Sequence, residues 1–313
     1  MDGQQTGLLK LFQKSTRMGK LWSIGIFEQP FNPYQFSLDN LIATFNSKSL
    51  RTRKKHTHTY ADPFLITHKD KLYLFAEVQE INGLGYINLW ESDNAKEWKD
   101  LGVVLKANYH FSYPFVFRDE LDGEFYLIPE SGQAGEIALY KFKEFPFGVQ
   151  KKCIILKGEF ADSSLVKVNQ VYYLSTTNLQ TGYYELYYTD KLIGGEWLKH
   201  PVSPIQYDKS VNRNGGGFIQ VNNAIFRIAQ NSENGYGGGI VILEVNKIDE
   251  QNYSESIVYK DTSGELRFDW QKKGRHHLSI ASYKGRTIIA SDGLQYDYWV
   301  NKLTGIYFKF VKR

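Results

Sequence analysis

The chain has 313 residues, of which 42% are hydrophobic and 15% aromatic, so it is long enough for one large all-β domain or two smaller ones. Its formal net charge is only +4, and the run RTRKK at Arg51–Lys55 carries four positive charges by itself, which argues against a general nucleic-acid surface. The single cysteine, Cys153, excludes an intramolecular disulfide and a zinc site built from thiolates.

The N-terminal region lacks the features of a membrane span or a secretion signal. No apolar run approaches the roughly 20 residues of a transmembrane helix, and no signal-peptide core precedes a cleavage site. Residues 1–20 are predicted to form a tail, either without structure or with a short amphipathic turn at Leu8–Phe12 that rests on the body or on a membrane surface. These observations predict a cytoplasmic protein.

Along the chain, a strand is predicted at Leu21–Phe27, and then one hairpin pattern recurs five times. Each copy is a short apolar strand, a polar turn and a second apolar strand. The copies begin at Asp62, Tyr113, Asp162, near Gly215 and at His277, so the steps are 51, 49, 53 and 62 residues. A strand repeat of roughly 40 to 50 residues is typical of propeller blades.

The sequence therefore predicts an all-β, five-bladed β-propeller that forms a single domain over residues 21–313. An unpaired terminal strand would leave an exposed sheet edge. We therefore expect the ring to close by pairing of Leu21–Phe27 with the final strand IYFKFVK, which begins at Ile306.

Polar residues stand at both ends of the repeated hairpins, where an apolar strand has no need of them. The first strands open with Asp62, Tyr113, Asp162, Arg213 with Asn214, and His276 with His277, and the second strands end with Glu77, Glu130, Thr176 with Thr177, Gln230 with Asn231, and Asp292. Equivalent repeat positions are neighbours around the axis of a propeller. The sequence thus predicts a polar ring at one axial opening.

A ring of carboxylates suits glycosyl transfer, which needs one acid to protonate the leaving oxygen and one carboxylate as base or nucleophile. Asp62 is the predicted base. Clustered carboxylates raise one another's pKa, so Glu130 or Glu77 could be the acid. The alternative is structural: Asp62 or Asp162 would cap a turn, and Glu77 and Glu130 would bond a neighbouring blade.

The other members of the ring are predicted to bind substrate: Glu77, Tyr113, Arg213, Asn214, His277 and Asp292. Arg213 would hold an anionic group or pair with a carboxylate of the ring. The two histidines alternate faces, so only one can face the channel. No cofactor is expected apart from a structural calcium that His277, Asp292 and water could hold near the axis.

Two further motifs bear on ligand binding. The basic residues Arg51, Arg53, Lys54 and Lys55 lead into Asp62, and they form either a solvated loop or a site that captures the phosphate of a sugar nucleotide or phospholipid-linked acceptor. The glycine runs Gly215–Gly217 and Gly237–Gly239 do not lead into a helix with Lys and Ser or Thr, so neither is a phosphate loop. They are expected to permit close backbone approach at blade corners.

Several motifs carry a family resemblance. They are ADPF at Ala61–Phe64, SYPFVF at Ser112–Phe117, YLIPES at Tyr126–Ser131, ELYYTDKLIGGEW at Glu185–Trp197, and the HH pair with SDG at Ser291–Gly293. Together they resemble the N-terminal domain of the glucosamine inositolphosphorylceramide transferase family, which is similar to the five-bladed propellers of glycoside hydrolase families 43 and 32. The resemblance runs from about Trp22 to the C-terminus.

The resemblance implies carbohydrate chemistry at the axis. In the family 43 pattern, Asp62 matches the first-blade base, and Asp162 could correspond to the residue that tunes the acid. The blade expected to supply the acid opens with Asn212, Arg213 and Asn214, and no Glu matches. Plant members of the transferase family carry a separate glycosyltransferase domain after this one, so this chain would be an accessory module or a transferase in its own right.

Three functions remain open at this stage. The first is a glycosyl-transferring enzyme, or its accessory domain, in the biosynthesis of a surface glycan, polysaccharide or glycolipid. The second is a family 43-like hydrolase with Asp62 as base and Glu130 as acid, and the third is a non-catalytic carbohydrate-binding propeller. The expected ligand is a sugar, a sugar nucleotide or a glycan, with no nucleic acid and with a membrane surface as a further candidate partner.

Overall fold

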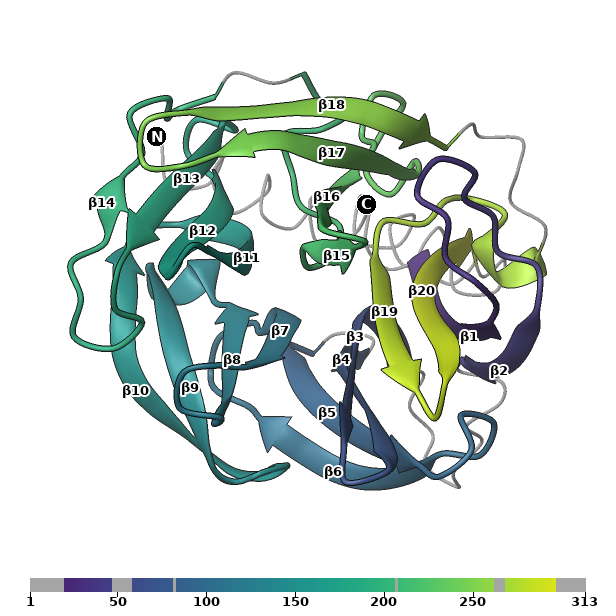
Figure 1. The fold of residues 1–313 in the computed structure, drawn as a ribbon. Helices are drawn as coiled ribbons and strands as arrows, with labels where there is room; N and C mark the ends of the chain where they lie inside the picture. Colours follow the sequence, from purple (N-terminus) through teal and green to yellow (C-terminus); the bar gives the residue numbers. More distant parts are fainter. Residues whose placement is uncertain (1–19, 47–57, 81–82, 206–207, 262–267, 297–313) are drawn as a thin grey trace, which may run out of the picture.

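The computed structural model describes residues 20–46, 58–80, 83–205, 208–261 and 268–296 and contains five four-stranded antiparallel sheets around a common axis (Figure 1). Two short 3₁₀ helices, at Gly132–Ala134 and Asp269–Gln271, are the only helices among these residues. The all-β, five-bladed propeller predicted from the repeats is confirmed. No helix in the described ranges is long and apolar enough to cross a bilayer.

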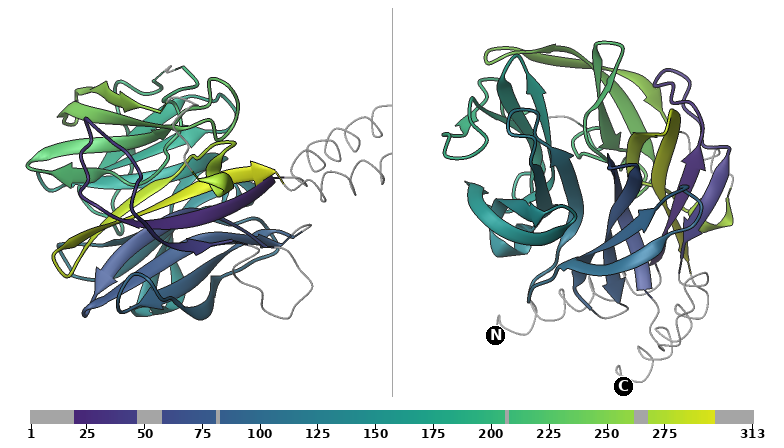
Figure 2. Two further views of the ribbon diagram at one scale, coloured as in Figure 1. Left: turned by 90° about the vertical axis from the view of Figure 1, so that its right-hand side faces the viewer. Right: turned by 60° about the horizontal axis from the view of Figure 1, so that its bottom comes forward.

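Four blades each use four consecutive strands. The first blade contains β3 (His58–His68), β4 (Lys71–Glu80), β5 (Gly85–Ser92) and β6 (Lys99–Leu105), and the second contains β7 (Ser112–Arg118), β8 (Phe125–Glu130), β9 (Glu136–Glu144) and β10 (Phe147–Lys157). The third contains β11 (Phe160–Val168), β12 (Val171–Asn178), β13 (Tyr184–Thr189) and β14 (Leu198–Lys199), and the fourth contains β15 (Ile219–Val221), β16 (Ala224–Gln230), β17 (Ile240–Ile248) and β18 (Tyr253–Lys260). Figure 2 shows the ring from two further directions.

The fifth blade joins the two ends of the described chain. It contains β19 (Leu278–Tyr283), β20 (Arg286–Tyr296), β1 (Lys20–Glu28) and β2 (Leu41–Phe45), in that order. Ring closure by an N-terminal strand is therefore confirmed, but the predicted partner is wrong. Strand β20 runs on to Tyr296 and pairs with one edge of β1, and β2 pairs with the other edge of β1. Both edges of β1 are thus occupied, and the segment from Ile306 lies outside the described residues.

The closing seam is packed by one tryptophan against two glycines. Gly25 of β1 and Gly293 of β20 leave room for Trp270, because a Cβ atom would lie 2.4 Å from the Trp270 ring at Gly25 and 2.6 Å from it at Gly293. Trp270 itself is buried. The absence of side chains at these two positions lets the indole cover the strand pair that closes the ring.

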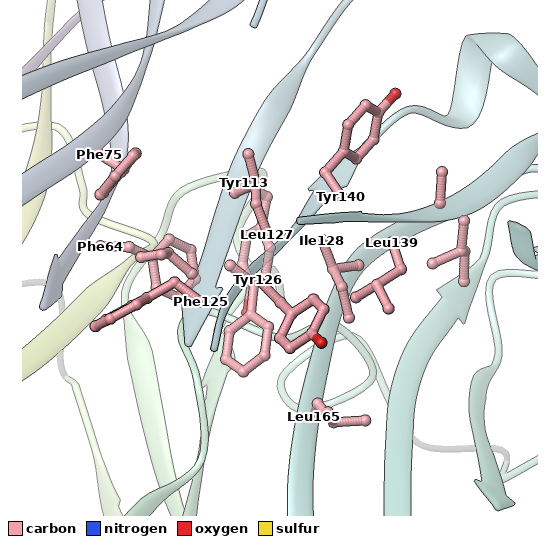
Figure 3. Close-up of a cluster of buried hydrophobic side chains, with 14 of the residues drawn as sticks. Phe64, Phe75, Tyr113, Phe125, Tyr126, Leu127, Ile128, Leu139, Tyr140 and Leu165 are labelled. Carbon is pink, nitrogen blue, oxygen red and sulfur yellow. The ribbon is translucent and has the colours of Figure 1, made fainter. Parts of the chain in front are cut away.

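The largest hydrophobic cluster joins the first three blades. Phe64 and Phe75 meet Tyr113, Phe125 and further side chains of β8, β9 and β11 (Figure 3). Each large apolar side chain buried in this way stabilises the fold by about 1.5–3 kcal/mol. The cluster lies between blades, so it fixes their relative positions and holds the inner strands around the axis.

The inner strands β3, β7, β11, β15 and β19 face the axis (Figure 1), and three of them carry the same irregularity. Between Ala61 and Phe64, between Ser112 and Phe115, and between Ala161 and Ser164, two residues of the inner strand oppose one residue of its neighbour. Such β-bulges re-aim side chains and occur near active sites.

The division into a tail, residues 1–20, and one domain, residues 21–313, stays a prediction. Residues 1–19 and 297–313 lie outside the described part of the chain.

Filling the space above Gly25 should destabilise the ring. We expect Gly25→Val to lower the free energy of unfolding by about 1–3 kcal/mol, because the new side chain overlaps the Trp270 ring. Urea unfolding of Gly25→Val, Trp270→Ala and the double variant measures the coupling. An equal cost of Gly25→Val with and without the indole would show that the seam is not packed in this way.

Candidate functional site

The three bulges bring Asp62, Tyr113 and Asp162 to equivalent positions around the axis. Their φ angles are 51°, 43° and 51°, a region that residues other than glycine seldom adopt. Backbone strain of this kind costs about 1–3 kcal/mol and gathers at functional sites. Its recurrence at one repeat position in three blades makes the axial opening the candidate site.

Each bulge donates its backbone N–H to a carboxylate of an adjacent blade. The Asp62 N–H lies 3.3 Å from Asp292 Oδ2, the Tyr113 N–H lies 3.1 Å from Asp62 Oδ2, and the Asp162 N–H lies 3.2 Å from Glu130 Oε2. Glu130 ends the second strand of its blade, as predicted, whereas Asp292 lies within β20, which continues to Tyr296. The acidic residues therefore have a structural role, as hydrogen-bond acceptors between blades, in addition to any functional one.

Asp62 is 5% exposed and sits among other acids. Burial raises the pKa of its carboxyl well above the usual range; the cationic His276 opposes this shift, while Glu77 and Asp162 reinforce it. A carboxylate with a raised pKa is a better proton acceptor near neutral pH. The environment of Asp62 thus suits the predicted base.

Arg213 lies between two of the acids. Its Nε contacts Asp162 Oδ2, and its Nη2 lies 3.4 Å from Glu130 Oε2. Gln230 Nε2 also donates to Asp162 Oδ2, at 2.9 Å. Burial and the neighbouring Asp162 raise the pKa of Glu130 well above its usual range, although Arg213 opposes the shift. Arg213 accordingly pairs with carboxylates of the ring, one of the two roles expected for it.

Glu77 is oriented by a histidine that the sequence did not single out. His110 Nε2 lies 3.1 Å from Glu77 Oε1, and His110 Nδ1 accepts the Gly85 N–H at 2.9 Å. Because Nδ1 is an acceptor, the proton of a neutral imidazole sits on Nε2 and points at Glu77. No side chain fits at Gly85, where a Cβ would lie 2.7 Å from Glu77 Oε1.

The two adjacent histidines have different roles. His276 Nδ1 lies 2.5 Å from Asp292 Oδ2, and its Nε2 lies 3.7 Å from Asp62 Oδ1. Burial alone would lower the pKa of His276, but the carboxylates of Asp292, Asp62 and Asp162 together outweigh it and raise the pKa to about 9. For Asp292, burial would raise the pKa, but His276 outweighs it and the net pKa is lowered. His276 is therefore the charged histidine of the ring.

His277, which the sequence predicted to bind substrate, is fully buried instead. Its ring packs edge-on against Phe64 and Tyr113, and neither ring nitrogen has a hydrogen-bond partner among the described residues. Burial lowers the pKa of His277 to about 3, so it is neutral. In this structure, His277 packs beneath the ring and has no exposed surface for a ligand.

Tyr113 and Asn214, two further predicted site residues, are buried and hold neighbouring groups in place by hydrogen bonds. The Tyr113 hydroxyl lies 2.7 Å from Ser164 Oγ and donates to the Gly216 carbonyl at 2.7 Å. Asn214 donates to the Asp162 carbonyl at 2.7 Å. Both are fully buried, so they fix the positions of the acids and present no surface to a ligand.

The glycine runs do permit close backbone approach, as predicted. A Cβ on Gly216 would lie 2.1 Å from the Leu278 carbonyl oxygen, and one on Gly274 would lie 1.7 Å from the Gly237 carbonyl oxygen.

The remaining expectations concern a metal and a phosphate. Asp62, His276 and Asp292 each offer one ligand atom within 4.8 Å of the others, but His277 does not belong to this group. Calcium takes 6–8 oxygen ligands, whereas this group offers two carboxylates and an imidazole already paired with Asp292. These residues fit calcium poorly. The basic residues Arg51–Lys55 lie outside the described residues.

The opposite pKa shifts of the two histidines predict a stability maximum near neutral pH. His276, with its pKa raised from 6.5 to about 9, contributes stability that is complete below pH 6.5 and is lost as the pH rises to about 9. His277, with its pKa lowered to about 3, costs stability as the pH falls from 6.5 toward 3.

Urea unfolding from pH 6.5 to 9.5 tests the first of these effects. We expect the loss of stability in that window to be smaller in His276→Gln than in the unaltered protein. In parallel, the imidazole resonance that disappears in this variant should titrate near pH 9. An identical pH dependence of the free energy of unfolding in the two proteins, together with a His276 titration near pH 6.5, would refute the ion pair between His276 and Asp292.

Comparison with curated proteins finds plant relatives. Over 289 residues the chain is 28% identical to glucosamine inositolphosphorylceramide transferase 1 of Arabidopsis thaliana, covering 83% of this chain and 37% of that protein. It is 30% identical over 226 residues to the protein of the same name from Oryza sativa subsp. japonica, covering 69% and 29%. The chain thus spans about a third of the length of these relatives.

Comparison with solved structures confirms the fold. A glycoside hydrolase family 43 β-1,3-galactosidase superposes with a TM-score of 0.58 at 12% identity, covering 73% of this chain and 84% of that one. An α-L-arabinofuranosidase from Clostridium thermocellum gives 0.55 at 13% identity, covering 73% and 80%. At such low identity the likeness establishes the propeller alone.

The sequence also matches, over residues 21–293, the family described as glucosamine inositolphosphorylceramide transferase 1, N-terminal. The match extends over all five blades and ends within β20, three residues before that strand does. It agrees with the resemblance carried by the ADPF, SYPFVF and YLIPES motifs. The chain therefore belongs to the family of glucosamine inositolphosphorylceramide transferase 1 N-terminal domains.

Proposed function

We propose that this propeller binds a sugar or glycan at its axial ring and serves glycosyl transfer in the assembly of a surface glycan or glycolipid, as a transferase or as the accessory domain of one. Family membership and the names of the plant relatives support a role in glycosyl transfer. The chain spans only part of those relatives, so the transfer chemistry itself belongs to this proposal. A cytoplasmic location and contact with a membrane surface are parts of the same proposal.

One observation argues most strongly against hydrolysis as the main role. Arg213 occupies the blade where a family 43 hydrolase would be expected to place its acid, and it engages both Glu130 and Asp162. A guanidinium does not give up its proton at physiological pH. Arg213 therefore cannot protonate a leaving oxygen from this position. In this proposal the two acids that it pairs with serve binding and electrostatics.

The charge of the ring indicates which part of a ligand lies there. Five carboxylates, Asp62, Glu77, Glu130, Asp162 and Asp292, surround two cations, Arg213 and His276. Like charges in a desolvated site repel, so a phosphate or carboxylate of the ligand is disfavoured at the axis. Sugar hydroxyls, which donate hydrogen bonds to carboxylates, fit there. The phosphate of a sugar nucleotide would then be left to the basic residues Arg51–Lys55.

Within this proposal, Asp62 and Glu77 accept hydrogen bonds from the sugar. Asp62 is positioned by its bulge and by the Tyr113 N–H, and Glu77 is positioned by His110. In a transferase, the raised pKa of Asp62 would let it take the proton of an acceptor hydroxyl.

The hydrolase alternative retains one favourable observation. Burial raises the pKa of Glu130 well above its usual range, and a protonated carboxyl could act as the acid. For this to occur, Arg213 would have to leave Glu130 when substrate binds.

Asp62→Asn tests the proposed function. Saturation-transfer NMR against free sugars, sugar nucleotides and glycans should detect a ligand of the unaltered protein. We expect the variant to bind it at least ~10-fold more weakly, since hydrogen bonds to charged groups are worth about 1.5–3 kcal/mol. Asp190→Asn, at an exposed turn, is the matched control and should bind normally.

Incubation with aryl glycosides and glycans separates binding from hydrolysis. We expect no cleavage by the unaltered protein. Cleavage that Glu130→Gln abolishes would establish the hydrolase instead, and full binding by Asp62→Asn would remove the axial ring as the site.

A further inference from the structure

An exposed tyrosine lies against the charged residues of the ring. Tyr236 belongs to the connection between β16 and β17, and the residue is 45% exposed. The glycines on either side, Gly235 and Gly237, have φ angles of 118° and 79°. Side-chain-bearing residues rarely adopt such angles, so this backbone path depends on the sequence Gly-Tyr-Gly.

The connection is anchored to the fifth blade. Gly238 forms a bridge with Arg275, and the Gly274 backbone approaches the Gly237 carbonyl so closely that no side chain fits between them. A Cβ on Gly237 would also lie 2.6 Å from the Trp22 ring. Close packing on several sides holds Tyr236 in one place.

The Tyr236 side chain is fixed by both hydrogen bonding and ring contacts. Its hydroxyl lies 2.7 Å from His276 Nε2. Its ring meets His276 edge-on at 5.0 Å and Trp22 edge-on at 6.0 Å, and the Arg213 guanidinium lies 5.5 Å from its centroid. The tyrosine thus bridges the two cations of the ring while nearly half of its surface remains open to solvent.

The other aromatic rings at the axis are covered. Trp22 stacks on His276 at 4.1 Å and is 9% exposed, and Phe64 and Tyr113 are 4% and 0% exposed. Among the aromatic rings that contact His276, His277 or Arg213 in the described part of the chain, Tyr236 alone presents substantial surface. A partly exposed aromatic residue held rigidly beside polar groups suits carbohydrate binding, because the C–H bonds of a sugar face attract the negative face of an aromatic ring.

We propose that Tyr236 is the stacking platform of the axial site and binds the C–H face of a pyranose whose hydroxyls reach the carboxylate ring. This inference rests on the proposed function, which it deepens by naming the residue that selects the sugar face. The ligand class is a pyranose with an uninterrupted C–H face, and no anionic substituent is needed. Because the platform is preorganised, little side-chain entropy is lost on binding.

Three substitutions at Tyr236 test the platform by saturation-transfer NMR with the sugar ligand found for the unaltered protein. Tyr236→Ala should weaken binding at least ~10-fold, whereas Tyr236→Phe and Tyr236→Trp, which keep an aromatic face, should bind within ~3-fold. Tyr34→Ala removes another exposed tyrosine, which contacts Glu244 and Phe226 of the fourth blade, and should bind normally. In the unaltered protein the largest saturation should fall on the C–H protons of one sugar face.

The outcomes separate this inference from the proposed function. Normal binding by Tyr236→Ala, together with weak binding by Asp62→Asn, would overturn the platform and leave the axial site intact. Saturation spread evenly over both sugar faces would also overturn it. A folded Tyr236→Ala that binds weakly, alongside a normal Tyr236→Phe, shows that binding needs the aromatic ring and not the hydrogen bond to His276, which both variants lose.

Discussion

The structure depends on hydrogen bonds from strained backbone amides to buried carboxylates across the blade boundaries. A buried N–H without a partner costs about 1–3 kcal/mol, and a buried carboxylate without one costs far more. The N–H groups of Asp62 and Asp162 satisfy Asp292 and Glu130, and Asp62 in turn accepts from Tyr113. The same acids therefore hold the blades together and surround the axis, so their positions and their chemistry depend on the same hydrogen bonds.

The distribution of positive charge decides what the acids can do. Arg213 is shared by Glu130 and Asp162, and His276 is held by Asp292 and faces Asp62. Buried ion pairs add little net stability, but they orient the acids and oppose the rise in carboxyl pKa that burial causes. Function resides in the site and not in the fold, so the role proposed for this chain rests on the charges of its ring and on its family.

Sequence reasoning reached the fold and most of the ring because both follow from a repeat. Equivalent positions in repeated hairpins must be neighbours around an axis, which is why Asp62, Glu130, Asp162 and Asp292 could be named together. The closing strand was misassigned because β20 continues beyond its hairpin motif to Tyr296, where periodicity gives no signal of length.

Single residues without a counterpart in the repeat were harder to predict. Alternation showed that only one of His276 and His277 could face the channel, but not which one; the bulges and ion pairs decide this in three dimensions. His110 and Tyr236 lie in connections and have no equivalent in other blades. The glycines beside Tyr236 were the one local signal, and they indicate a special backbone path without indicating what it positions.

The most direct test of the central claim is ¹³C NMR of the Asp62 and Glu130 carboxyl groups as a sugar ligand is added at constant pH. A recognition site at the axis predicts that the Asp62 resonance shifts in proportion to bound ligand, that Glu130 keeps the signature of its pairing with Arg213, and that the sugar is recovered unchanged. A ligand that binds without moving the Asp62 resonance, or that is cleaved as Glu130 is released from Arg213, would contradict it.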